Sequence, residues 1–231
     1  MIRPLRRRCL GIFVAGLAVL AAGCDSVNQQ LSSFGLGGGA GSGAQSVSYD
    51  KVPPEHEHYL GRASTAELLR QYQGKLVADP NADFYVNQVG QALALVSSRP
   101  ETFTGYHFAI LDSDEVNAFG APGGFILISR GLLRCCPDEE ALAAVLAHEI
   151  VHVARRHPLF GLSPSYLADL VMPLAADGTA RMGTAYEYAV RDIVTTLKQG
   201  YPRDLESDAD REAIKLAQKL GYDPGGLAAA L

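Results

Sequence analysis

The feature that most constrains this chain is the pentapeptide HEIVH at positions 148 to 152. Apolar residues recur at helical spacing on both sides of it, which predicts that it lies in the middle of a helix. Residues four apart project from one face of a helix, so the imidazoles of His148 and His152 can bind one ion together. Glu149 lies beside the first histidine, where a carboxylate can accept a proton from water without binding the ion. The pattern therefore predicts a fold built around a metal-binding helix.

A second motif supplies the rest of such a site. Glu206 and Asp210 are also four apart, on a later predicted helix. Alone, this pair would indicate acids on a solvated helix face. Together with the first motif, Glu206 can complete a His, His, Glu ligand set that leaves one position for water, and Asp210 can accept a hydrogen bond from a ligand histidine. The two motifs predict one Zn²⁺ per chain, bound by His148, His152 and Glu206.

The other histidines are predicted to lie outside this site. A metzincin motif would need a third histidine at position 158, which is Pro158. His157 is predicted to be a polar residue at the end of the helix, and His107 a structural residue of a strand. A second metal site at His56 and His58 remains an alternative.

The remaining pattern predicts helices around a small sheet. Apolar residues at helical spacing predict helices over 64–77, 83–97, 184–198 and 203–220. Branched and aromatic residues predict strands over 106–111 and 125–129, with a turn at 120–124 between them. Together with the helix of the HEIVH motif, these elements predict an α+β fold.

The N-terminus has the pattern of a lipoprotein signal peptide. A basic stretch up to Arg8 precedes an apolar stretch of roughly 14 residues, shorter than the ~20 that span a membrane as a helix. The sequence AAGC at 21–24 resembles a lipobox, in which the cysteine becomes the acylated first residue. We therefore predict a signal peptide over 1–23, lipidation of Cys24 and a flexible tether over 24–58. Secretion without a lipid is the alternative.

This leader predicts a protein of the bacterial cell envelope, anchored by lipid on the periplasmic side, and it does not decide between the inner and the outer membrane. Four of the 20 Lys and Arg residues lie in the leader, so the rest of the chain carries 16 basic and 25 acidic residues, a charge of -9. Nucleic acid is therefore not predicted as a partner. No oligomeric state follows from the sequence.

Two cysteines, Cys135 and Cys136, are adjacent just before the main helix. A disulfide between neighbours is strained, so two packed thiols are the preferred prediction, and a vicinal disulfide or a bond to a partner is the alternative. Neither cysteine has the spacing of a metal site.

Four motifs together resemble a known family. They are HEIVH at 148–152, E-x-x-A-D at 206–210, NAFGAPGG at 117–124 and SRGLL at 129–133. Over about 63–231 the chain resembles the zinc peptidase family of the CAAX prenyl endopeptidase and HtpX, and more closely its periplasmic and lipoprotein members. The resemblance implies a zincin-like (minigluzincin) fold, in which a small β-sheet packs against the active-site helix and further helices. It also implies a zinc metallopeptidase domain over 59–231.

Carried over by position, the resemblance implies a role for each residue of the two main motifs. His148, His152 and Glu206 are the zinc ligands, and Glu149 is the general base. Asp210 supports a ligand histidine.

The resemblance also implies where a substrate lies. Asn117, Ala118 and Phe119 would belong to an edge strand that binds an extended peptide by strand addition. Tyr201 and Arg203 match the family pattern too, and Arg203 is a candidate for oxyanion support. Family members usually continue past the last helix into a Ser/Thr-His-Pro segment, which this sequence lacks. Either the sequence is truncated, or it is a minimal form whose oxyanion support comes from another group.

These features predict a zinc-dependent metalloendopeptidase of the bacterial cell envelope that hydrolyses unfolded or misassembled proteins. Its expected partners are protein or peptide substrates and, through the lipid anchor, a membrane. The alternative is a chaperone-like or binding lipoprotein that keeps the zinc site with weak or no proteolysis. A purely structural zinc site is disfavoured, because three protein ligands leave a position open and Glu149 would have no role.

Overall fold

The computed structural model of the chain describes residues 48–171 and 179–226, with the side chains of all of these except 179–182. The predicted signal peptide, Cys24 and the predicted tether up to residue 47 lie outside the described residues. Within the described part of the chain, no helix is long and apolar enough to cross a membrane.

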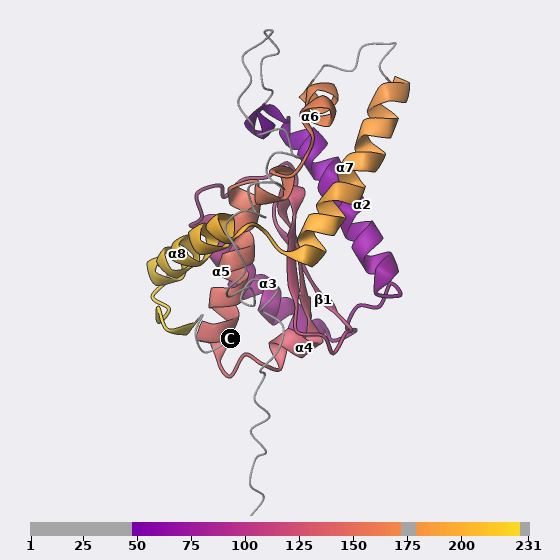
Figure 1. Ribbon diagram of the computed structural model, residues 1–231. Helices are drawn as coiled ribbons and strands as arrows, with labels where there is room; N and C mark the ends of the chain where they lie inside the picture. Colours follow the sequence, from indigo (N-terminus) through magenta and orange to yellow (C-terminus); the bar gives the residue numbers. More distant parts are fainter. Residues whose placement is uncertain (1–47, 172–178, 227–231) are drawn as a thin grey trace, which may run out of the picture.

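Three short strands form a sheet at the centre of the domain (Figure 1). They are β1 (His107–Leu111), β2 (Ala118–Ala121) and β3 (Phe125–Ser129). Their order is β1-β3-β2, with β1 parallel to β3 and β2 antiparallel to it. Among the described residues, β2 therefore lies at an edge of the sheet and pairs with one strand only.

Helices cover both faces of this sheet (Figure 1). The α-helices are α2 (Pro54–Gln71), α3 (Pro80–Leu95), α4 (Arg130–Leu133), α5 (Glu139–Ala154), α6 (Pro164–Val171), α7 (Thr179–Gln199) and α8 (Arg203–Lys219). Short 3-10 turns are η1 (Tyr49–Lys51), η2 (Pro122–Gly124) and η3 (His157–Leu159). The predicted α+β fold, with a small sheet packed against the helix of the HEIVH motif, is confirmed.

Side chains of the strands alternate between the two faces, because successive residues of a strand point in opposite directions. Ile126 and Ile128 of β3 pack in one apolar cluster with residues of α3, α5 and α8. Leu127, between them, packs in a second cluster with residues of α2, α6 and α7. The sheet is thus the middle of three layers, and α5 lies in the layer that α3 and α8 share.

The metal motif lies on α5, which is buried from Ala141 to Val153. Asp138 caps this helix, because its side chain accepts a hydrogen bond from the N–H of Ala141 at 2.9 Å. Glu139 and Glu140 lie in the first turn, where the helix dipole favours acids. Local capping therefore sets the start of α5, and packing on both sides fixes its orientation.

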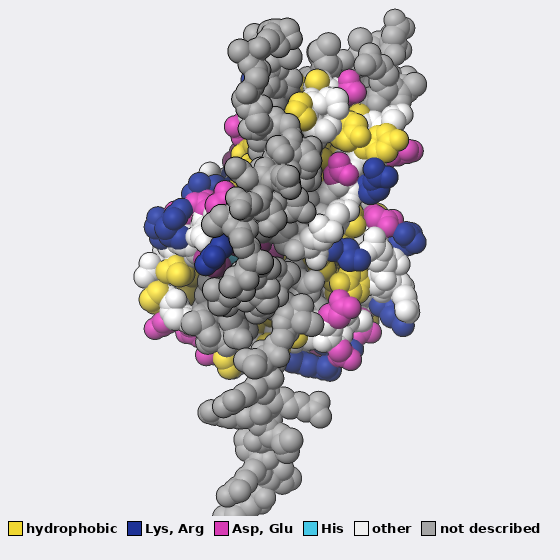
Figure 2. Space-filling model, viewed as in Figure 1, with side chains coloured by type: hydrophobic (Ala, Val, Ile, Leu, Met, Phe, Trp, Pro, Cys, Tyr) yellow, Lys and Arg dark blue, Asp and Glu magenta, His cyan; other side chains and the backbone are white. Residues whose placement is uncertain are grey.

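Charged side chains cover the outer surface of α8, at the left in Figure 2. On this helix Lys215 pairs with Glu212 at 2.8 Å, and Arg155, which directly follows α5, lies 3.3 Å from Asp208. Exposed ion pairs of this kind contribute little to stability, about 0–1 kcal/mol each. The attachment of α8 to α5 therefore depends on apolar contacts, such as those of Ala209, and on the metal ligands described below.

The folded domain begins earlier than predicted. A tether up to residue 58 is wrong for residues 48–58, because η1 and the first turn of α2 lie there. Glu57 of α2 is buried and forms an ion pair with Arg99 at 2.8 Å, and Arg156 approaches the same carboxylate at 3.0 Å. These partners are distant in sequence, so the polar stretch around Glu57 has no local signal that separates it from a tether.

Two local predictions are corrected by the structure. Gly120 belongs to β2, and the turn is confined to η2, where both glycines take positive φ angles of 73° and 104°. Cys136 carries a free thiol, so the alternative of a vicinal disulfide between Cys135 and Cys136 is wrong. The strain of a bond between neighbouring residues explains why they do not pair with each other.

Candidate metal centre

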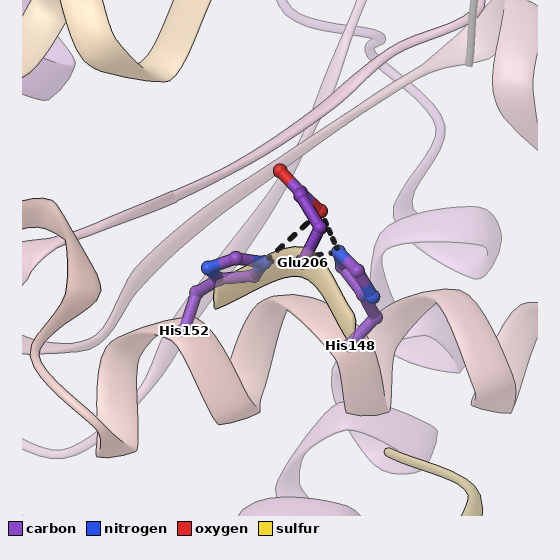
Figure 3. Close-up of side chains that lie close together, drawn as sticks. All are labelled: His148, His152 and Glu206. Atoms are coloured by element: carbon purple, nitrogen blue, oxygen red, sulfur yellow. Dashed lines mark hydrogen bonds and ion pairs between the residues drawn. The ribbon is translucent and has the colours of Figure 1, made fainter. Parts of the chain in front are cut away.

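Two helices bring three candidate ligands together (Figure 3). His148 and His152 lie one turn apart on α5, and Glu206 comes from the first turn of α8. The Nε2 atoms of the two histidines are 3.0 Å apart. Glu206 Oε2 lies 3.3 Å from His148 Nε2 and 3.7 Å from His152 Nε2. Within the described residues, these three form the one group of three or more side chains that could hold a metal ion.

The spacing of these atoms fits a tetrahedral ion. Bonds of about 2.0–2.1 Å at tetrahedral angles place neighbouring ligand atoms roughly 3.3 Å apart. The electrostatics also favour a cation where the three atoms converge. Burial opposes a charge on His148, but hydrogen bonds with Asp210 and Glu206 outweigh it and raise the pKa of this histidine to about 10. In the metal-free chain a proton therefore takes the place that suits a divalent cation.

The other two ligands are in the protonation states that bind a metal. Burial lowers the pKa of His152 to about 4, so its imidazole is neutral. Burial opposes ionisation of Glu206, but hydrogen bonds with His148 and His152 hold its pKa below the usual value. The backbone N–H of Tyr201 donates to Glu206 Oε1 at 3.0 Å, which leaves Oε2 directed at the histidines.

Each ligand histidine has a partner for its second ring nitrogen. Asp210 Oδ1 lies 2.9 Å from His148 Nδ1, so the structure brings together the pair proposed from the sequence. His157 Nδ1 lies 3.0 Å from His152 Nδ1. Because Nε2 of His152 faces the other ligands, its Nδ1 carries the proton and His157 accepts it. The two partners thus fix the tautomer and the orientation of both rings.

His157 is the site residue that the sequence reasoning missed. It is not a solvated residue at the end of the helix, because it is only 4% exposed and packs against His152. Arg156 takes a left-handed conformation with φ 58°, which ends α5 and turns the chain so that His157 returns to the site. The one signal in the sequence is that His157 follows His152 by five residues. This spacing does not distinguish a histidine that supports a metal ligand from an exposed histidine at the end of a helix.

Replacing His157 by phenylalanine is expected to weaken zinc binding by about 10- to 100-fold, as for other residues that support a ligand. Phenylalanine keeps an aromatic ring in this buried position but cannot accept the proton of His152. Zinc affinity is measured by competition with a chromophoric chelator. His107→Phe, in β1, is the matched control. An unchanged zinc affinity in His157→Phe would contradict the supporting role.

Glu149 lies against the same site and has the properties of a general base. Its side chain is 6% exposed, and burial raises its pKa to about 7 although His148 and the N–H of Gly120 act in the opposite direction. A Cβ on Gly120 would lie 2.8 Å from the backbone oxygen of Glu149 and 3.1 Å from its carboxylate. The glycine therefore lets β2 approach α5 closely enough to bond this carboxylate.

Of the other predicted site residues, three lie at the edge strand β2 and one, Arg203, lies outside the site. Ala118 and Phe119 lie in the edge strand β2, as the resemblance implies, and Asn117 directly precedes it. The side chain of Asn117 accepts a hydrogen bond from the N–H of Ala118 at 2.9 Å, and Phe119 is buried in the cluster with α2. Arg203 is exposed at the start of α8 and has no side-chain hydrogen bond or ion pair to another described residue. The structure does not bring Arg203 into the site.

The alternative of a second metal site at His56 and His58 is not supported. His56 Nδ1 lies 2.6 Å from the carbonyl oxygen of Leu170, whereas His58 Nδ1 lies 3.1 Å from the hydroxyl of Thr104. The two rings therefore have separate partners. His107 shares the hydroxyl of Thr104 at 2.9 Å.

Two histidines and a glutamate base on one helix, with a glutamate ligand from a later helix, define the class of metallopeptidases with a His, His, Glu ligand set. A comparison with protein families agrees, because the model of peptidase family M48 matches residues 80–231. The chain belongs to peptidase family M48. This membership and the ligand cluster imply a divalent metal at the site.

Several relatives carry protease names. The beta-barrel assembly-enhancing protease of Escherichia coli (strain K12) is 33% identical over 165 residues, which is 68% of this chain and 34% of that protein. The putative beta-barrel assembly-enhancing protease of Vibrio cholerae is 28% identical over 172 residues, 69% of this chain and 34% of that protein. The mitochondrial metalloendopeptidase OMA1 of Schizosaccharomyces pombe is 24% identical over 177 residues, 76% of this chain and 51% of that protein. The chain thus spans about a third of the length of the bacterial relatives.

Proposed function

We propose that this chain is a zinc-dependent endopeptidase of the bacterial cell envelope that hydrolyses unfolded or misassembled proteins. The observation that carries the proposal is the convergence of His148, His152 and Glu206 beside Glu149, in a chain that belongs to a peptidase family. Three protein ligands leave one position of a tetrahedral ion open, which is typical of a catalytic and not of a structural zinc site.

Zinc, when bound by these ligands, acts as a Lewis acid toward water and toward the peptide carbonyl. Glu149 accepts a proton from the attacking water while the water oxygen bonds to the carbonyl carbon. Glu149 then gives that proton to the amide nitrogen as the C–N bond breaks. A pKa raised by burial to about 7 suits both transfers, because such a carboxyl group accepts and releases a proton near neutral pH.

The position of β2 at the edge of the sheet supports an extended peptide as the substrate. In an antiparallel ladder, alternate residues direct their N–H and C=O groups toward the neighbouring strand. The N–H of Ser129 donates to the carbonyl of Asn117 at 2.9 Å, so the backbone groups of Ala118 and Gly120 point away from β3. The N–H groups of these two residues are bonded to the side chains of Asn117 and Glu149, so their carbonyl oxygens are the groups that would accept hydrogen bonds from a peptide. A peptide that pairs with this edge is bound through its backbone, which every sequence shares once it is unfolded.

The leader and the names of the bacterial relatives support the envelope as the location. A signal peptide over 1–23 would direct the chain across the inner membrane, and a lipid on Cys24 would anchor it there or at the outer membrane. The name beta-barrel assembly-enhancing protease supports misassembled envelope proteins as substrates. The envelope location and the misassembled envelope proteins as substrates are therefore both part of the proposal.

Substitution of Cys24 by alanine is expected to abolish incorporation of labelled lipid, because acylation needs the thiol of that cysteine. Cys9→Ala changes the other cysteine of the leader and is expected to leave labelling intact. Labelling is measured in cells that express each full-length variant with a radioactive or alkyne fatty acid. Equal labelling of the Cys24→Ala variant and the wild type would reject lipidation at this position.

The proposed activity is tested on the purified protein with casein, an unfolded substrate. Bound metal is measured by mass spectrometry, and cleavage is measured before and after removal of the metal by a chelator. We expect about one zinc ion per chain, loss of cleavage on chelation and recovery when zinc is returned. Zinc bound without any cleavage would instead favour the chaperone-like or binding alternative.

A further inference from the structure

One hydroxyl group in the metal site has no role in the reaction described above. It belongs to Tyr201, in the turn between α7 and α8 that follows Gly200, whose φ angle of 84° ends α7. The ring of Tyr201 stacks on His152, with centroids 4.1 Å apart and planes inclined by 16°. Its backbone N–H donates to Glu206. Tyr201 therefore contacts two of the three candidate ligands, and its ring is held against the site.

The hydroxyl oxygen of Tyr201 is buried and has no hydrogen-bond partner in the described part of the chain. A buried hydroxyl without a partner costs folding free energy, and a catalytic role is one reason for a chain to keep such a group. The acid groups nearby are already engaged. Glu206 accepts from Tyr201 N–H and faces the histidines, and Glu149 accepts from Gly120 N–H. A partner for the hydroxyl is therefore expected from outside the chain.

We propose that Tyr201 is a catalytic residue whose hydroxyl donates a hydrogen bond to the carbonyl oxygen of the peptide bond being cleaved. This inference rests on the proposed peptidase function. When the water oxygen bonds to the carbonyl carbon, the electrons of the C=O double bond move to the carbonyl oxygen, which gains negative charge. A fixed neutral donor stabilises that charge more than it stabilises the uncharged carbonyl. The C=O bond re-forms as the C–N bond breaks, so the phenol keeps its own proton.

The phenol of a tyrosine keeps its proton at neutral pH and can donate it in a hydrogen bond. Arg203, the candidate for this task from the sequence, is exposed at the start of α8.

Phenylalanine at this position removes the oxygen and keeps the ring on His152. We expect Tyr201→Phe to lower kcat for peptide hydrolysis by about 100-fold, as for the loss of other donors to a developing oxyanion. The KM is expected to stay within about twofold, and the zinc content is expected to be that of the wild type. Tyr188→Phe, an exposed position on α7, is the matched control.

A binding measurement separates catalysis from mere support of His152. A phosphinic peptide has a tetrahedral phosphorus whose oxygens resemble the charged carbonyl oxygen. Its affinity is expected to fall by about the same factor as kcat, whereas the affinity of the hydrolysed product peptide stays constant. In Tyr201→Leu, which also removes the stacking, zinc affinity is expected to fall as well.

Three outcomes would overturn the proposal. They are an unchanged kcat in Tyr201→Phe, a zinc affinity reduced as far as in Tyr201→Leu, or equal losses of affinity for the phosphinic and the product peptide. Failure of the proposed function itself has a different signature. In that case the wild type cleaves casein no better than its Glu149→Gln variant, and binding of the phosphinic peptide still tests Tyr201.

Discussion

Replacement of Glu149 by glutamine is expected to lower kcat/KM for casein by about 10³-fold, the scale of a general base that also acts as the acid. Glutamine fills the same volume, and its side-chain oxygen still accepts the N–H of Gly120, but it neither takes nor returns a proton. Zinc content is expected to be that of the wild type, because Glu149 is not among the three converging ligands. The loss would therefore be confined to the chemical step.

The stability of this variant follows from the pKa of Glu149. Burial raises that pKa from 4.5 to about 7 in the folded chain, so the carboxyl group costs folding free energy that grows as the pH rises above 4.5 and is fully present above about 7. A neutral glutamine removes this cost. At pH 8 the melting temperature of the metal-free Glu149→Gln variant is therefore expected to equal or exceed that of the metal-free wild type.

Glu140→Gln is the matched control for this experiment, because Glu140 lies on the same helix and its side chain has no hydrogen bond or ion pair to another described residue. Its kcat/KM is expected to stay within about twofold of the wild-type value. Activity of Glu149→Gln at the level of this control would rule out Glu149 as the base.

Replacement of Glu206 by glutamine is expected to weaken zinc binding by more than the about 10- to 100-fold of a supporting residue. Glu206 is the one ligand that α8 supplies, and its carboxylate is ionised, whereas the amide oxygen of glutamine is neutral. Casein cleavage is expected to fall with zinc occupancy. Zinc affinity is measured by chelator competition, with Asp204→Asn in the same turn of α8 as the control. Wild-type zinc affinity in Glu206→Gln would contradict the His, His, Glu ligand set.

The same variant is expected to show how far zinc stabilises the fold. A ligand that binds the folded chain alone raises stability with its concentration relative to its Kd, by about 2.7 kcal/mol at a concentration of 100 Kd. Zinc should therefore raise the melting temperature of the wild type and of Asp204→Asn. In Glu206→Gln this rise should be small or absent at the same zinc concentration, because the Kd is much higher.

Most helices and two of the strands could be predicted because their signals are local. The start of α5 follows from the cap at Asp138 and the acids after it, and the alternation of β3 follows from its apolar residues. The pairing of His148 with His152 is equally local, since it needs only one helical turn. The motif at Glu206 could be linked to them because two helical spacings of chemically matched residues fit one metal ion.

The start of the domain could not be predicted in the same way. Residues 48–58 are polar and contain adjacent prolines, which is typical of a linker. They are ordered on the domain because Glu57 is buried between Arg99 and Arg156. Long-range ion pairs leave no periodicity in the sequence, so only the packed structure reveals them.

By itself, the sequence determined which chemistry is available to this chain, since residue type and helical spacing decide which groups can bind a metal and accept a proton. The tertiary structure decided which groups actually meet. It brought His157 to His152 through the turn at Arg156, placed Tyr201 on the ring of His152, and left Arg203 exposed. These contacts join segments that meet only when α5, α8 and the turns around them are packed together. Side chains from the whole core determine that packing, so it cannot be read from a local stretch of sequence.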